Sequence, residues 1–142
     1  APAPNCVLRV LEGESSFDPD FVKQMDDILD PLTGGNTFEY ASELGGVVVW
    51  AHEQDDFADA EDFYARSVWR PLLVDPEKWT SQVIDDSLTN VGWLGDTIVV
   101  DGEAHFTTTN ADGQGELVRY KNGKLTSRLS FSSWLQVVER IR

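Results

Sequence analysis

The sequence predicts an α+β domain in which N-terminal helices pack on a mostly antiparallel sheet. Two helix-start signals, Asp18-Pro19-Asp20 and Asp55-Asp56, are each followed by apolar residues at helical spacing. After residue 96, strand-like runs alternate with turn sequences, which predicts the sheet. A length of 142 residues suits one domain, so we expect a flexible tail at 1–4 and a single domain over 5–142.

Two helices are expected in the first third of the chain. Asn5 can cap a helix over residues 7–11, although residues this apolar suit a strand equally well. The second helix begins at Asp18-Pro19-Asp20 and is ended by Pro31 and two glycines. Its apolar face is formed by Phe21, Met25, Ile28, Leu29 and Leu32. Three aspartates lie toward its C-terminus, where the helix dipole disfavours negative charge, and they indicate either a cation or partner site or a solvated surface: Asp26, Asp27 and Asp30.

The middle of the chain predicts two strands and a further helix. Residues 37–42 carry alternating aromatic side chains and residues 46–51 are a short β-branched run, so both are expected to be strands. Asp55 or Asp56 can cap a helix over about residues 57–69. Residues 79–90 are compatible with helix or strand, and the sequence leaves both open.

The C-terminal part predicts an antiparallel meander with three reversals. Asp-Gly and Asn-Gly favour the positive φ angles of two-residue hairpin turns, and a glycine-rich loop lies between them. The reversals are Asp101-Gly102, residues 110–115 and Asn122-Gly123. They separate strands at 97–100, 103–106, 117–120 and 125–129. Ser132 or Ser133 can cap a last amphipathic helical stretch.

The charge of the chain is strongly asymmetric. Net charge is −14, and residues 1–62 carry fifteen acidic and two basic side chains, whereas residues 116–142 carry two and six. Such a field repels nucleic acid and favours cationic partners, unless the acidity reflects adaptation to salt. Because no apolar run approaches about 18 residues, no membrane partner is expected. The single cysteine, Cys6, favours the cytoplasm over secretion but leaves the location open.

Residues 116–125, Glu-Leu-Val-Arg-Tyr-Lys-Asn-Gly-Lys-Leu, precede a polar strand ending at Phe131 and an amphipathic stretch. This segment resembles the end of SnoaL-like proteins of the nuclear-transport-factor-2-like superfamily. Residues 95–100 resemble the strand before it, and residues 17–40 are similar to the first helices and strand. The resemblance implies a cone-shaped barrel, in which a strongly curved sheet wraps helices around an apolar pocket, and frequent homodimers.

In that superfamily the pocket binds apolar or polycyclic molecules, and some members use it for acid–base isomerase, cyclase or hydrolase chemistry without a cofactor. His105 and Glu103 are the candidate catalytic groups, provided that Ala104 and Phe106 point outward; the opposite register places His105 in solvent. Ser132 or a neighbour stands where the family has its final-strand aspartate, which puts the cyclase and epoxide hydrolase mechanisms in doubt. Whether the protein is an enzyme therefore stays open. The candidate pocket-lining residues are Tyr40, Trp50, Tyr64, Trp69, Trp79, Thr107 and Arg128.

Two further interpretations compete with this one. The acidic run from His52 to Asp62 has ligand types for a hard cation but lacks the spacing of a calcium loop, and a capped helix start explains it, so no metal site is predicted. The alternative function is a non-catalytic interaction domain whose acidic half meets a basic partner. An apolar cavity with His105 or a carboxylate on its wall would support the pocket function. An interior filled by tryptophan would support the alternative.

Overall fold

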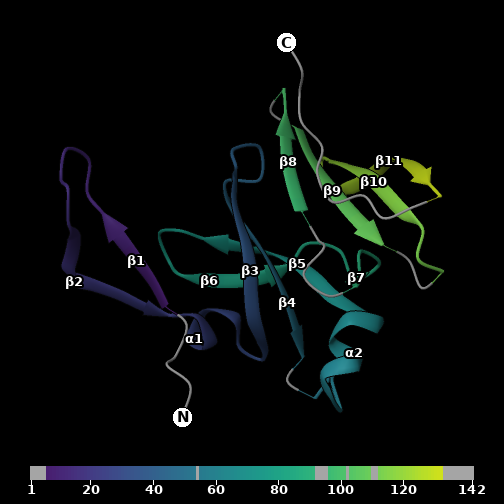
Figure 1. The fold of residues 1–142 in the computed structure, drawn as a ribbon. Helices are drawn as coiled ribbons and strands as arrows, with labels where there is room; N and C mark the ends of the chain where they lie inside the picture. The colour runs from purple at the N-terminus through teal and green to yellow at the C-terminus, as the bar shows by residue number, and fades with distance from the viewer. Residues whose placement is uncertain (1–5, 54, 92–95, 102, 110–111, 133–142) are drawn as a thin grey trace.

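The structure is a computed structural model that describes residues 6–53, 55–91, 96–101, 103–109 and 112–132. Within these ranges the chain forms eleven strands and two short helices (Figure 1). The first half comprises β1 Cys6–Val10, β2 Phe17–Gln24, α1 Met25–Leu29, β3 Leu32–Ala41, β4 Gly46–Glu53 and α2 Ala60–Ala65. The second half comprises β5 Ser67–Asp75, β6 Thr80–Val83, β7 Asn90–Val91, β8 Asp96–Val100, β9 Glu103–Thr109, β10 Gly115–Lys121 and β11 Lys124–Phe131. The tail predicted at 1–4 and the last helical stretch, beyond Ser132, lie outside the described residues.

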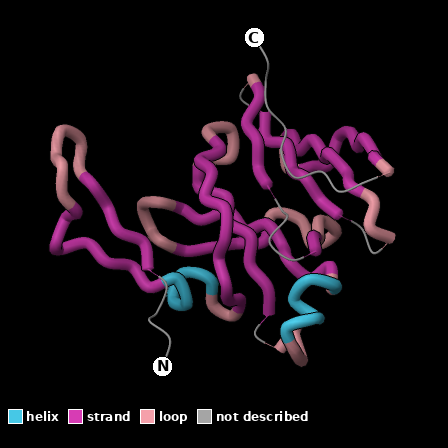
Figure 2. The backbone as a smooth tube through the Cα atoms, viewed as in Figure 1, coloured by secondary structure: helices cyan, strands magenta, loops and turns pink. Residues whose placement is uncertain are grey.

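The strands form three antiparallel sheets. β1 and β2 make a hairpin, β3-β4-β5-β6 make a sheet to which β7 adds by pairing with β5, and β11-β10-β9-β8 make the third. In Figure 2 strands dominate the trace, the two helices are short, and the β1–β2 hairpin projects to one side. None of the sheets is strongly curved or closed, so the predicted α+β class and the cone-shaped barrel implied by the resemblance are wrong for this chain. Neither described helix is long and apolar enough to cross a bilayer.

The central strand β4 is covered on both faces. Val48 and Trp50 point into a core shared with the four-stranded sheet, where Phe106 and Val118 lie. Val49, by contrast, points into a second core built with α1. Because successive side chains of a strand point to opposite faces, a strand buried on both faces is a continuous apolar run. The run Val47 to Ala51 has this pattern, which places the five-stranded sheet between the two other layers.

The two helices predicted in the first third are largely strands. Residues 7–11 fall mainly in β1, and the signal at Asp18-Pro19-Asp20 lies within β2 because Phe17–Gln24 pairs with Cys6–Val10. The Asp18 carboxylate accepts hydrogen bonds from Arg9 and from the backbone N–H of Asp20. The group that could cap a helix is therefore engaged in the strand instead. Only Met25–Leu29 is helical, and it buries Met25, Ile28 and Leu29 as the predicted face required.

The helix predicted over residues 57–69 is shorter and starts later. Asp59, instead of Asp55 or Asp56, is the capping residue, since its carboxylate accepts from the backbone N–H groups of Glu61 and Asp62. The helix ends at Ala65 because the following residues join β5, where Trp69 is buried at 3% exposure. Tertiary pairing has therefore overridden the local helical signal.

The strand and hairpin predictions are confirmed where the structure describes them. Residues 37–42 and 46–51 fall almost entirely in β3 and β4. Asn122 and Gly123 have φ angles of 52° and 76°, the positive values that a tight hairpin turn requires, and they join β10 to β11. Residues 80–83, left open by the sequence, form the strand β6.

Candidate functional site

The predicted catalytic pair lies on β9, and the alternation of this strand determines where it points. Ala104 and Phe106 are fully buried in the core between the sheets. Glu103 and His105 consequently lie on the opposite face and are half-buried. This is the register in which Phe106 occupies the interior, so the pair faces away from the shared core.

Glu103 is held by two basic side chains of β10. Arg119 Nη2 lies 2.6 Å from its carboxylate, and Lys121 Nζ also bonds to it. The Lys121 hydrogen bond, followed by the Arg119 one, lowers the pKa of Glu103 to about 2. A carboxylate with this pKa is a weak base at neutral pH, so the geometry suits a cross-strand ion pair better than proton transfer.

His105 and Glu43 complete the cluster around Glu103. His105 Nδ1 lies 3.0 Å from the carbonyl oxygen of Glu103, which can only accept, so Nδ1 donates. Glu43, in the loop between β3 and β4, accepts a hydrogen bond from the backbone N–H of Ala104 and so ties the two larger sheets together. Partial burial, and then the nearby Glu103 carboxylate, raise the pKa of Glu43. Sequence reasoning missed Glu43 because no local pattern distinguishes it from its acidic neighbours.

The predicted pocket-lining residues are scattered over the fold. Trp50 and Trp69 are buried in the core between the sheets, and Thr107 is fully buried on β9. Tyr40 is 58% exposed on β3, and Arg128 is exposed on β11, paired with Glu116 at 2.9 Å. Trp79 lies in the turn between β5 and β6, and the side chain of Tyr64 is outside the described part of the chain. The candidate residues whose side chains the structure describes therefore do not line one shared cavity.

The interior between the two larger sheets is filled by aromatic rings. Trp50 and Phe106 meet edge to face with centroids 6.4 Å apart, and Phe106 meets Tyr120 at 6.0 Å. At one end, the His52 ring packs between Phe57 and Trp69 at 4.5 and 4.6 Å. Rings in such contact leave little space for a polycyclic ligand in this core.

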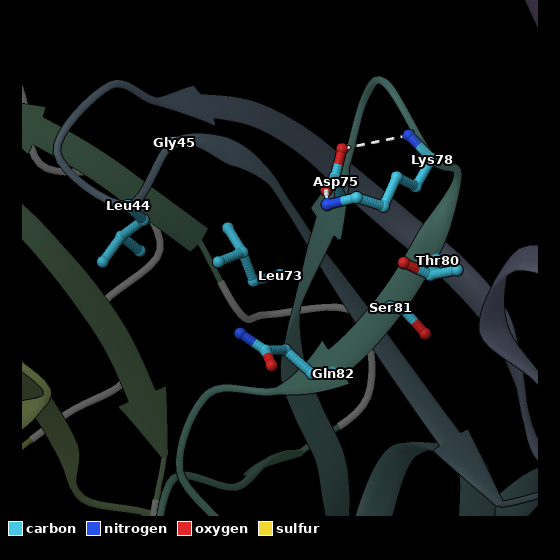
Figure 3. A pocket seen from close by; sticks show the side chains of 8 residues that line it. All are labelled: Leu44, Gly45, Leu73, Asp75, Lys78, Thr80, Ser81 and Gln82. Carbon is cyan, nitrogen blue, oxygen red and sulfur yellow. Dashed lines mark hydrogen bonds and ion pairs between the residues drawn. The ribbon is translucent and has the colours of Figure 1, made fainter.

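A polar hollow of about 380 Å³ lies beside the turn from β5 to β6 (Figure 3). In Figure 3, Asp75 and Lys78 face one another at one end of the hollow, and Leu44 and Leu73 lie at the other. Lys78 Nζ is 2.8 Å from the Asp75 carboxylate, which also accepts from the backbone N–H groups of Glu77 and Lys78. The Lys78 side chain, followed by these backbone donors, lowers the pKa of Asp75 to about 2. Asp75 and Lys78 therefore pair with each other, and the bonds to Asp75 stabilise the turn between β5 and β6.

The acidic run from His52 to Asp62 is engaged in local structure. The Asp56 and Asp62 carboxylates accept from the backbone N–H groups of Glu53 and Ala58, and Asp59 caps α2. Within the described ranges, no three His, Cys, Asp or Glu side chains are grouped closely enough to hold a metal ion. These acids act as helix and turn caps.

The β1–β2 hairpin is apolar on both faces. Phe21 is 9% exposed and packs edge to face on Trp79, with ring centroids 5.2 Å apart, and Val7 packs on the core beside α1. On the other face, the cross-strand pairs Leu8–Val22 and Val10–Phe17 form a stripe whose members are 42–62% exposed. We call these four residues the hairpin stripe. A two-stranded hairpin with one apolar face covered and the other exposed is typical of a binding surface.

The segment that carries this exposed apolar area is acidic. Residues 6–41, from β1 to β3, carry eight acidic and two basic side chains, and Arg9 is already paired with Asp18. Seven of the ten large apolar side chains exposed in the described chain lie in this segment: Leu8, Val10, Leu11, Phe17, Val22, Phe38 and Tyr40. We call the exposed side chains of residues 6–41 the N-terminal surface.

A small apolar hollow opens on the same part of the molecule. It holds about 70 Å³ and is lined by residues of β1, α1, β3, β4 and the β5–β6 turn, among them Val7, Met25, Ile28, Phe38, Val47 and Trp79. Phe38 is 52% exposed, so the hollow reaches the surface beside it.

Comparison with protein-family models, with curated proteins and with solved structures finds no match to this chain.

Proposed function

We propose that this chain is a non-catalytic binding module that holds a cationic protein partner on its N-terminal surface. The observation that carries the proposal is the hairpin stripe, an exposed apolar surface in an acidic segment of the chain. Apolar contact supplies affinity, while the carboxylates select a partner of opposite charge and speed its approach.

The aromatic packing of the interior supports this function over a small-molecule pocket. Ligand pockets usually hold roughly 300 Å³ or more and are mostly apolar. The apolar hollow holds about 70 Å³. Two larger hollows, of about 380 Å³ at Asp75 and about 340 Å³ at Glu103, are lined mainly by polar and charged residues. Binding and conversion of an apolar ligand at His105 and Glu103 stays a prediction, and the charged lining of the hollow at Glu103 does not favour it.

A peptide of alternating Lys and Leu is a suitable probe, because as a strand it presents one basic and one apolar face. We expect it to bind in calorimetric titration, more weakly as salt rises, since screening weakens exposed charge attraction. A peptide of alternating Glu and Leu should not bind. Equal binding of both peptides, or binding of neither, would refute the proposal.

Replacing Phe17 and Val22 by Ser tests the location of the binding surface. Both side chains are more than half exposed, so the variant should fold normally but bind the Lys-Leu peptide about tenfold more weakly. The matched control replaces Leu129 and Phe131, two exposed apolar residues of β11, by Ser. Equal losses in the two variants would show that binding is not located on the hairpin.

A further inference from the structure

We propose that the apolar hollow beside Phe38 receives a single aliphatic side chain of the cationic partner, here called the anchor. This inference rests on the proposed function and specifies the chemistry of the partner: one Leu-like residue flanked by Lys or Arg. The first argument is size. A volume of about 70 Å³ is too small for a typical small-molecule ligand and is of the order of one aliphatic side chain.

The second argument is the chemistry of the lining. Val7, Ile28 and Val47 present aliphatic groups, Met25 contributes a flexible thioether, and Trp79 contributes a ring. Met adapts its shape to irregular partners and is frequent at such binding surfaces. A dry apolar hollow favours an apolar occupant, because a charged or polar group would lose its hydration there without replacement.

The third argument is the charge around the opening. Asp26 and Asp27 follow the lining residue Met25 on α1, and both carboxylates are exposed. Asp26 accepts from the Thr33 hydroxyl, and within the described part of the chain Asp27 takes part in no ion pair. A basic residue beside the anchor would therefore meet the Asp26 and Asp27 carboxylates while the anchor fills the hollow.

Met25 makes the proposal directly measurable, because it is the single methionine of the chain and lines the hollow. Protein labelled with ¹³C at the methionine methyl gives one resonance for occupancy of this site. The probes are two peptides with three Lys on each side of a central Leu or Ala. We expect the Leu peptide to shift the Met25 resonance and to bind about tenfold more tightly than the Ala peptide.

A variant that fills the hollow supplies the second measurement. Val47→Ile adds a methylene to the wall of the hollow and should remove the advantage of the Leu peptide while charge-dependent binding persists. Val83→Ile, on β6 and outside the lining, is the matched control and should keep the advantage.

The outcomes separate this inference from the proposed function. If the alternating Lys-Leu peptide binds but Met25 does not respond to the central Leu, the anchor is refuted and the binding module stands. If no cationic peptide binds, both are refuted. A Met25 resonance that moves with protein concentration alone would assign the hollow to a second copy of the chain and would also overturn the inference.

Discussion

Trp79 is held in a backbone conformation that normally suits glycine. Its φ angle is 58°, in the left-handed region, at the end of the turn between β5 and β6. The turn is fixed on one side by Asp75, whose carbonyl oxygen accepts from the Trp79 N–H at 2.8 Å. On the other side the indole ring packs on Phe21 and lines the apolar hollow. Ring packing therefore holds a torsion that costs about 1 kcal/mol or more for a residue with a Cβ.

Substitutions at this position should separate the two contributions. Trp79→Ala removes the ring and keeps the strain, and we expect it to lower the free energy of unfolding by about 3 kcal/mol, at the low end for Trp because the ring is only partly buried. Trp79→Gly removes the ring and the strain together. It should therefore be about 1 kcal/mol more stable than the Ala variant, the reverse of the order expected elsewhere in a strand or turn.

Urea unfolding followed by circular dichroism measures both free energies. The neighbouring exposed residue Thr80 is the matched control, because it lies in β6 and has no positive φ angle. There the Gly variant should be less stable than the Ala variant by about 0.5–1 kcal/mol. If Gly is also the less stable substitution at Trp79, the torsional strain assigned to this turn is refuted.

Two further predictions concern acid stability and close packing. Asp75 and Glu103 have pKa values of about 2, below the ordinary 3.8 and 4.5, so the stability they contribute is present above about pH 5 and is lost as pH falls toward 2. The double variant Asp75→Asn, Glu103→Gln should show a flatter decline of the urea midpoint over this range, and an unchanged slope would contradict the assignment. Gly46→Ala places a Cβ 2.6 Å from the Val74 carbonyl oxygen and should cost about 2–4 kcal/mol in chemical denaturation, because β4 and β5 must separate. Gly45→Ala, with open space and a φ of 70°, should cost only about 1 kcal/mol, and equal costs would rule out the steric explanation.

The parts of the fold that local chemistry determines were predictable from the sequence. The Asn122-Gly123 turn follows from the torsional freedom of those two residues, and no distant contact is needed to specify it. The strands of the β8–β11 meander follow for the same reason, since each pairs with its neighbour along the chain. The predicted inner face of Met25, Ile28 and Leu29 is also confirmed, because those residues are buried.

The errors arise where pairing between distant residues decides the structure. The residues at Asp18 favour a helix start when considered alone. In the structure Leu8 pairs with Val22, and neither segment alone indicates that pairing. A fold class built on N-terminal helices was therefore wrong, because most of both predicted helical segments joined sheets or loops and only Met25–Leu29 and Ala60–Ala65 are helical. Local propensity is a weak guide when long-range ladder formation competes with it.

The register of β9 was undecidable for a related reason. Alternation identifies the inner face only when one face meets water, yet Phe106, Thr107, Thr108 and Thr109 are all buried, so both faces of the strand are covered in its second half. The sequence predicts that Glu103 and His105 lie on the same face of a strand, and the structure confirms this. The sequence could not reveal that Arg119 and Lys121 hold the Glu103 carboxylate, because that contact depends on the pairing of β10 with β9.

The alternation of β4 has a consequence for how the protein unfolds. Val49 and Trp50 are consecutive residues, yet each belongs to a different core. Neither core can lose its packing while β4 stays in place for the other, because one backbone carries both sets of side chains. The two cores therefore unfold as one cooperative unit. Loss of packing around Trp50 in the first core also destabilises the second core beside α1, because both depend on β4.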